Sequence, residues 1–167
     1  MAKAKKVNKP VGILIFGIAE IVFSVISVLL FISGLFLMLA LTGIADAEGM
    51  GELNQIFFQE YIGMTIGLYI ISLGISISSF IGAIGLLKSR EGGRKILIIA
   101  AIASISIDVI SSIMEFIPGT SSIVPGMGIM MAFSITIGLI PIAYNGVLIW
   151  YLNKKNVKEY FQIMKQK

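Results

Sequence analysis

Four long runs of apolar residues divide the chain, with polar residues gathered between them. The runs extend from Val11 to about Thr42, from Ile62 to Leu87, from Ile96 to Ile117 and from about Gly128 to Leu152. An α-helix needs about 20 apolar residues to cross the roughly 30 Å hydrocarbon core of a bilayer. The pattern therefore predicts an all-α, four-helix bundle in the membrane, forming a single domain over residues 1–167.

The first run is longer than a perpendicular crossing requires. At 1.5 Å per residue it reaches about 48 Å, so we expect this helix to tilt and to project past the outer surface. In the polar segment that follows, Leu53, Ile56, Phe57 and Tyr61 recur at helical spacing. This spacing predicts a short helix lying on the membrane surface.

The composition agrees with a membrane protein. Hydrophobic residues make up 57% of the chain, charged residues only 13%, and the mean hydropathy is +0.98. Soluble domains carry roughly 25% charged residues, so this chain has too few to cover a soluble surface. Cys and His are both absent, which excludes disulfides, thiolate nucleophiles and imidazole metal ligands. We expect no enzyme activity, no cofactor and no metal.

The basic residues fix a predicted orientation. All 13 Lys and Arg residues lie before the first run, between the second and third, or after the fourth. Basic loops stay on the cytoplasmic side, so both termini and the middle loop are predicted to be cytoplasmic in a multi-pass protein of the cell membrane. The net charge of +4 follows from these flanking clusters, and nucleic acid is not an expected partner.

The segment 153–167 predicts a short amphipathic helix. Apolar residues recur there at i, i+3, i+4 and i+7, beginning at Val157. Such a helix binds anionic lipid headgroups at the cytoplasmic face, or it serves only as an orientation signal. The predicted membrane-surface anchor consists of Lys154, Lys155, Lys158, Tyr160 and Phe161.

Small residues recur along each apolar run at spacings of three and four. Helices in lipid associate through close packing of such residues. The positions predicted to serve helix packing are Gly17, Gly74, Ser78, Gly82, Gly138 and Pro141. Packing of this kind also allows a homo-oligomer or a membrane-protein partner.

Two carboxylates lie near the middle of the apolar runs, where charge is costly. Glu20 is about 13 Å and Asp108 about 18 Å from the cytoplasmic ends of their helices, and an Asp at the centre costs at least about 2.5–3.5 kcal/mol. No run contains Lys or Arg, so these groups must be protonated, hydrated, bound to a cation or hydrogen-bonded. With Asn145, Ser76 and Ser79 they form a candidate midplane polar site. Its role is either structural or in the passage of protons or cations.

Two parts of the chain carry a topological resemblance. Gly85–Lys88 followed by Arg94–Lys95, and Leu148–Leu152 followed by Val157–Phe161, resemble small four-helix prokaryotic membrane proteins of unknown function. The resemblance implies a shared architecture and no activity. Tetraspanins and claudins have the same number of spans, but the Cys residues of their outer loops are absent here.

Three hypotheses follow. The chain is a structural or accessory subunit of a membrane assembly, or a small proton or cation permeation unit that uses Glu20 and Asp108. An intramembrane hydrolase built on the same two carboxylates is the third, although no motif of such enzymes surrounds them.

Overall fold

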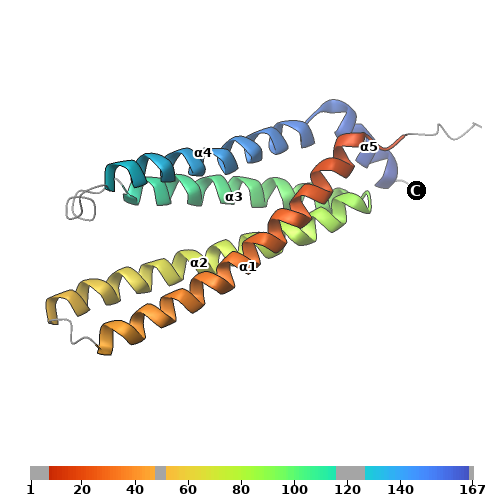
Figure 1. Ribbon diagram of the computed structural model, residues 1–167. Helices are drawn as coiled ribbons and strands as arrows, with labels where there is room; N and C mark the ends of the chain where they lie inside the picture. Colours follow the sequence, from red (N-terminus) through yellow and green to blue (C-terminus); the bar gives the residue numbers. More distant parts are fainter. Residues whose placement is uncertain (1–7, 48–51, 116–126, 166–167) are drawn as a thin grey trace, which may run out of the picture.

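The computed structural model of the protein describes residues 8–47, 52–115 and 127–165. Within these ranges the regular structure is entirely helical (Figure 1). The five helices are α1 (Val11–Ala47), α2 (Glu52–Leu87), α3 (Glu91–Glu115), α4 (Met127–Leu152) and α5 (Lys155–Lys165).

The described residues contain three helices long and apolar enough to cross a membrane. The segments are Val11–Phe36, Ile66–Leu87 and Glu91–Ile113, and Leu139–Leu152 in α4 is a shorter apolar stretch. Helices are a stable way to cross hydrocarbon because every backbone hydrogen bond stays within the segment. The chain is therefore an integral membrane protein with several apolar helices.

Helix boundaries differ from the prediction at the start of α2 and α3. The residues expected to form a separate surface helix after Glu52 belong instead to the first turns of α2, because their apolar spacing continues into the span without a proline. Likewise, α3 begins at Glu91 and not at Ile96. Arg94 and Lys95 thus lie in a helix, where both interact with the Glu91 carboxylate.

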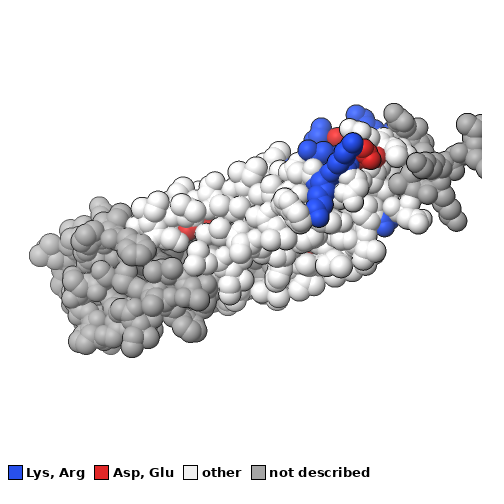
Figure 2. All heavy atoms as spheres, turned by 90° about the horizontal axis from the view of Figure 1, so that it is seen from above, with Lys and Arg blue, Asp and Glu red and all other residues white. Residues whose placement is uncertain are grey.

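From α1 to α4, consecutive helices run antiparallel, as Figure 1 shows. α2 packs between α1 and α3, and α3 packs between α2 and α4, whereas α1 meets α4 over a short stretch. α5 lies across the end of the molecule where α1 begins and α4 ends. We call this end the basic end, because every described Lys and Arg is found there (Figure 2).

The main buried core lies at the basic end. It combines residues from all five helices, and its largest fully buried members are Ile13, Leu86, Leu97, Leu148, Leu152, Val157 and Phe161. Farther along α1 most apolar side chains are exposed, such as Leu29 at 61% and Phe36 at 69%. Those side chains suit a lipid environment and not water.

The turn between α2 and α3 is compact and fully hydrogen-bonded. Arg90 N–H donates to the carbonyl of Gly85 at 2.8 Å, and Ser89 N–H donates to that of Leu86 at 3.0 Å. These two bonds form a Schellman motif, in which the residue after the helix adopts a left-handed conformation. Ser89 occupies that position with φ of 58°, where glycine is usual. Its hydroxyl is 2.7 Å from the Tyr160 hydroxyl of α5.

Two glycines let α2 and α3 touch through their backbones beside this turn. A Cβ atom on Gly85 would lie 2.7 Å from the Cα of Gly93. A Cβ on Gly93 would meet the backbone of Gly85 and Leu86. Neither backbone has room to yield, so the crossing requires glycine at both positions.

The predicted packing residues fall into two groups. Gly17 and Gly82 are buried, and Cβ atoms there would lie 2.6 Å from Leu87 and 2.9 Å from Leu97 respectively. Gly74 and Ser78 both lie on the exposed side of α2, so their predicted role in helix packing stays a prediction. Eight residues rotate a helix face by about 80°, so Gly74 and Gly82 do not share one face.

The other two predicted packing residues lie in α4. Pro141 lies inside the helix and is exposed, so its predicted packing role also stays a prediction. The surroundings of Gly138 lie outside the described residues.

Candidate functional site

Glu20 is a buried carboxylate in the middle of α1. Its side chain is only 5% exposed, and Ser24 one turn farther along is 4% exposed. The carboxyl lies within interaction range of the hydroxyls of Ser79 from α2 and Tyr144 from α4. Glu20 therefore joins three helices at one point.

Tyr144 is the aromatic part of this group. Its ring packs edge-on against Phe23 at 5.1 Å and tilted against Phe16 at 6.2 Å, measured between ring centroids. Its hydroxyl is fully buried, yet it has no well-aligned hydrogen bond to any described residue. The Tyr144 hydroxyl is thus close to the Glu20 carboxyl, but the two groups are not in ideal hydrogen-bond geometry.

Asp108 belongs to a second polar group, between α3 and α4. The Asn145 side-chain amide donates to the Ser104 hydroxyl at 3.2 Å, and that hydroxyl donates to the Asp108 carboxylate at 3.5 Å. Asn145 is 9% exposed, whereas Asp108 is only half-buried. A chain of side-chain hydrogen bonds therefore connects α3 to α4.

The predicted midplane site is thus divided. Glu20 and Ser79 come together, and Asp108 and Asn145 come together, but no described contact joins the two carboxylates. The groups are neighbours because Tyr144 and Asn145 are consecutive in α4. Ser76 belongs to neither group, since its hydroxyl donates to the carbonyl of Ser72 at 2.9 Å.

Sequence reasoning missed Tyr144 as a partner of Glu20. Tyr144 is not on the small-residue face of α4 that drew attention to Asn145. One signal was available, because a tyrosine within an apolar run needs a polar partner for its hydroxyl. Ser104, which links Asp108 to Asn145, was likewise not predicted as part of the site.

The chemistry available to these groups is hydrogen bonding and proton binding. Within the described residues, the ion pairs involve Glu91 and Glu159 at the basic end, and none involves Glu20 or Asp108. A protonated carboxyl both donates and accepts hydrogen bonds, which suits the hydroxyl and amide groups around it. The described part of the chain does not bring three or more carboxylates together at one point.

The aromatic residues of the predicted membrane-surface anchor lie elsewhere than expected. Tyr160 is 4% exposed and Phe161 is 1% exposed, and both pack in the core at the basic end. An amphipathic helix buries its apolar face against lipid or against protein, and α5 buries it against protein. These two rings are therefore not available to lipid.

The lysines of that anchor keep their polar surroundings. The Lys155 side chain is 93% exposed and that of Lys158 is also exposed. The Lys154 ammonium group lies 3.7 Å from the centre of the Trp150 ring, a cation–π contact.

Two further cationic side chains at the basic end donate hydrogen bonds to carbonyl groups at helix C-termini. The guanidinium of Arg94, a residue 9% exposed, donates to the carbonyl of Leu152 at 3.1 Å, at the end of α4. The Lys9 ammonium group donates to the carbonyl of Leu87 at the end of α2. Cations are favourable at helix C-termini, where carbonyls lack partners, so both side chains hold helix ends in place.

No protein-family model, curated protein or solved structure matches the chain. The resemblance to small four-helix prokaryotic membrane proteins therefore extends to the apolar helices and establishes no family. Any function must be argued from the geometry described above.

Proposed function

We propose that the protein is a structural or accessory subunit of a membrane assembly, with four spans and both termini in the cytoplasm. The observation that carries this proposal is the exposed face of α2. Gly74 and Ser78 lie on it, and a Cβ on Gly74 would meet no described atom within 4 Å. Ile70, Ile71 and Ile77 on the same side are 60%, 54% and 48% exposed.

A second membrane helix fits this face better than lipid alone. Small residues let two helix backbones approach closely, which is the main source of helix association in lipid. The Ser78 hydroxyl donates to the carbonyl of Gly74 at 2.8 Å, so the face has no unsatisfied polar group to repel a partner. We expect a helix of another copy or of a larger complex to pack there.

The substitution Gly74→Leu tests this face. It should reduce co-purification of a partner, or dissociate a homo-oligomer, while leaving the single chain folded. Gly146→Leu is the matched control, because Gly146 on α4 is also exposed with no described atom within 4 Å of its Cβ position. A wild-type protein that always purifies as a lone chain from native membrane would contradict the proposal.

The orientation is supported by the clustering of cations at the basic end (Figure 2). The chain has no native Cys, so single-Cys variants can be labelled without background. Cys at Arg90 and Lys155 should react with a membrane-impermeant maleimide from the cytoplasmic side, and Cys at Ser121 from the opposite side. Labelling of Arg90→Cys and Lys155→Cys from different sides would disprove the four-span arrangement.

The alternative function is permeation of protons or cations through the midplane groups. It is favoured by Glu20, a buried carboxylate with no described ion pair. The two cavities at the turn between α2 and α3 do not include Glu20 or Asp108. Proton and cation flux into liposomes should be the same for wild type, Glu20→Gln and Asp108→Asn if the role is structural. A flux that either substitution abolishes would favour permeation.

A further inference from the structure

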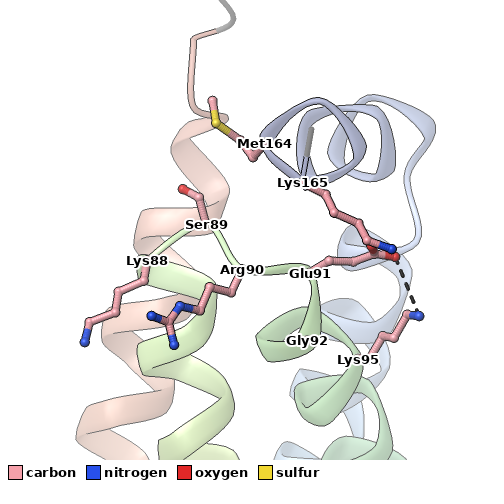
Figure 3. Close-up of a pocket in the computed structure, with 8 residues that line it drawn as sticks. All are labelled: Lys88, Ser89, Arg90, Glu91, Gly92, Lys95, Met164 and Lys165. Atoms are coloured by element: carbon pink, nitrogen blue, oxygen red, sulfur yellow. Dashed lines mark ion pairs between the residues drawn. The ribbon is translucent and has the colours of Figure 1, made fainter. Parts of the chain in front are cut away.

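Two open cavities meet at the turn between α2 and α3. The first has a volume of about 500 Å³ and is lined by Lys88, Ser89, Arg90, Glu91, Gly92, Lys95, Met164 and Lys165 (Figure 3). The second, of about 460 Å³, is lined by Phe80, Ile81, Ile84, Gly85, Lys88, Arg90, Gly92, Gly93 and Ile96. They share Lys88, Arg90 and Gly92, so a basic mouth adjoins an apolar groove.

The mouth carries an excess of positive charge. Four cations line it, together with one carboxylate, Glu91. That carboxylate is 3.7 Å from the Lys95 ammonium group and 3.9 Å from the Arg94 guanidinium. Lys88 and Arg90 have no described ion pair, and Figure 3 shows their side chains extending alongside the end of α2. Both are therefore positioned to bind an anion at the edge of the groove.

The groove continues from this mouth toward the middle of the molecule. Its exposed apolar side chains include Phe80 at 37%, Ile81 at 54% and Ile96 at 37%. Phe80 lies eight residues before Lys88, which corresponds to about 12 Å along the helix. An apolar groove that begins below a pair of cations matches the shape of a phospholipid, whose charged phosphate lies above its acyl chains.

We infer that this site binds an anionic phospholipid, with its phosphate between Lys88 and Arg90 and an acyl chain along Phe80 and Ile96. Arg and Lys are the usual phosphate-binding side chains, and basic residues next to membrane spans attract anionic lipids. A soluble phosphate would use the mouth but would leave the apolar groove empty. The inference rests on the membrane-spanning arrangement proposed above, which places hydrocarbon beside α2.

The role of Lys88 and Arg90 is tested by measuring how much lipid the protein retains in detergent solution. Purified protein is incubated with phosphatidylglycerol or phosphatidylcholine, and native mass spectrometry measures the lipid that stays bound. We expect clear preference for phosphatidylglycerol, reduced roughly tenfold by the double substitution Lys88→Gln and Arg90→Gln. Lys155→Gln with Lys158→Gln removes the same charge from the predicted membrane-surface anchor on α5, and this variant should lose less retention because no apolar groove adjoins these exposed lysines.

The groove is tested separately by filling it. Gly92 lines both cavities, and a Cβ there meets no described atom within 4 Å. Gly92→Leu should therefore keep the fold, confirmed by a melting temperature no lower than that of the wild type, while reducing phosphatidylglycerol retention at least fivefold. Gly146→Leu provides the same change on exposed α4 and should have no effect.

Three results would overturn the inference. The first is equal retention of the two lipids by the wild type, and the second is equal loss in both charge-removal variants. The third is complete displacement of phosphatidylglycerol by millimolar inorganic phosphate, which would indicate a site for free phosphate. All measurements use detergent-solubilised protein, so a reversed membrane orientation or a missing partner would leave them unchanged. Failure of the lipid site is thus distinguishable from failure of the proposed function.

Discussion

The basic end and the middle of the membrane segment are held together in different ways. At the basic end, α2 and α3 touch through backbone at Gly85 and Gly93, and α5 adds the buried Phe161 to the core. In the middle, Glu20 meets hydroxyl groups across helices while nearby apolar side chains face outward. Water drives burial at the first region, whereas lipid provides no such drive in the second.

This difference predicts that substitutions at the basic end cost more stability than those in the middle. The substitutions below are ordered by the expected loss in the free energy of unfolding. Each is measured by unfolding in mixed detergent micelles.

Phe161→Ala should have the largest effect. The ring is 1% exposed, and removing a buried Phe typically costs about 3–5 kcal/mol. Ile163→Ala on the same helix is the control, because Ile163 is 37% exposed and should lose less. If both variants lose little, α5 does not hold the basic end together.

Gly93→Ala should destabilise the protein by about 2–3 kcal/mol, because the added methyl group overpacks against the backbone of α2. The neighbouring Gly92→Ala has open space and should stabilise α3 by up to about 1 kcal/mol. Equal effects at these two adjacent glycines would show that the backbone contact does not exist.

Arg94→Gln should cost about 1–2 kcal/mol, because it removes a charged donor from the last carbonyl of α4. Lys95→Gln is its control, since the Lys95 side chain is 65% exposed and an exposed ion pair is worth less than about 1 kcal/mol. A larger loss at Lys95 would assign the effect to the Glu91 ion pair instead.

Glu20→Gln should have the smallest effect, below about 1 kcal/mol, because polar contacts between membrane helices average about 0.6 kcal/mol. The amide keeps the shape of the side chain and still hydrogen-bonds to hydroxyls. A loss in the free energy of unfolding as large as that of Phe161→Ala would show that the middle of the membrane segment contributes as much stability as the basic end.

Helical periodicity over long apolar runs was enough to predict the helices and their approximate positions. It also predicted a single midplane polar site, whereas the structure divides those residues between a group around Glu20 and a group around Asp108. Periodicity could not distinguish a helix face that contacts lipid from one that contacts protein, because both require the same apolar spacing. The apolar face of α5 has the same spacing whether it covers lipid or protein, so the burial of Tyr160 and Phe161 was not predictable from spacing alone.

The close contacts between helices also could not be predicted from the sequence. Gly82 and Gly74 have similar neighbours in the sequence, yet only Gly82 is buried, because the contact depends on how the helices cross. The partnership of Gly85 with Gly93 depends on the tight turn at Ser89. Contacts of this kind are set by the relative placement of helices, which a single sequence does not encode in any local pattern.

The position of α5 also has a consequence for biosynthesis. Ile13 and Phe161 share one core, but the ribosome makes Phe161 roughly ten seconds after Ile13 at typical elongation rates. During that interval the helix ends at the basic end lack α5 as a cover and are open to chaperones and proteases. The core at the basic end is therefore completed only after α5 has been made.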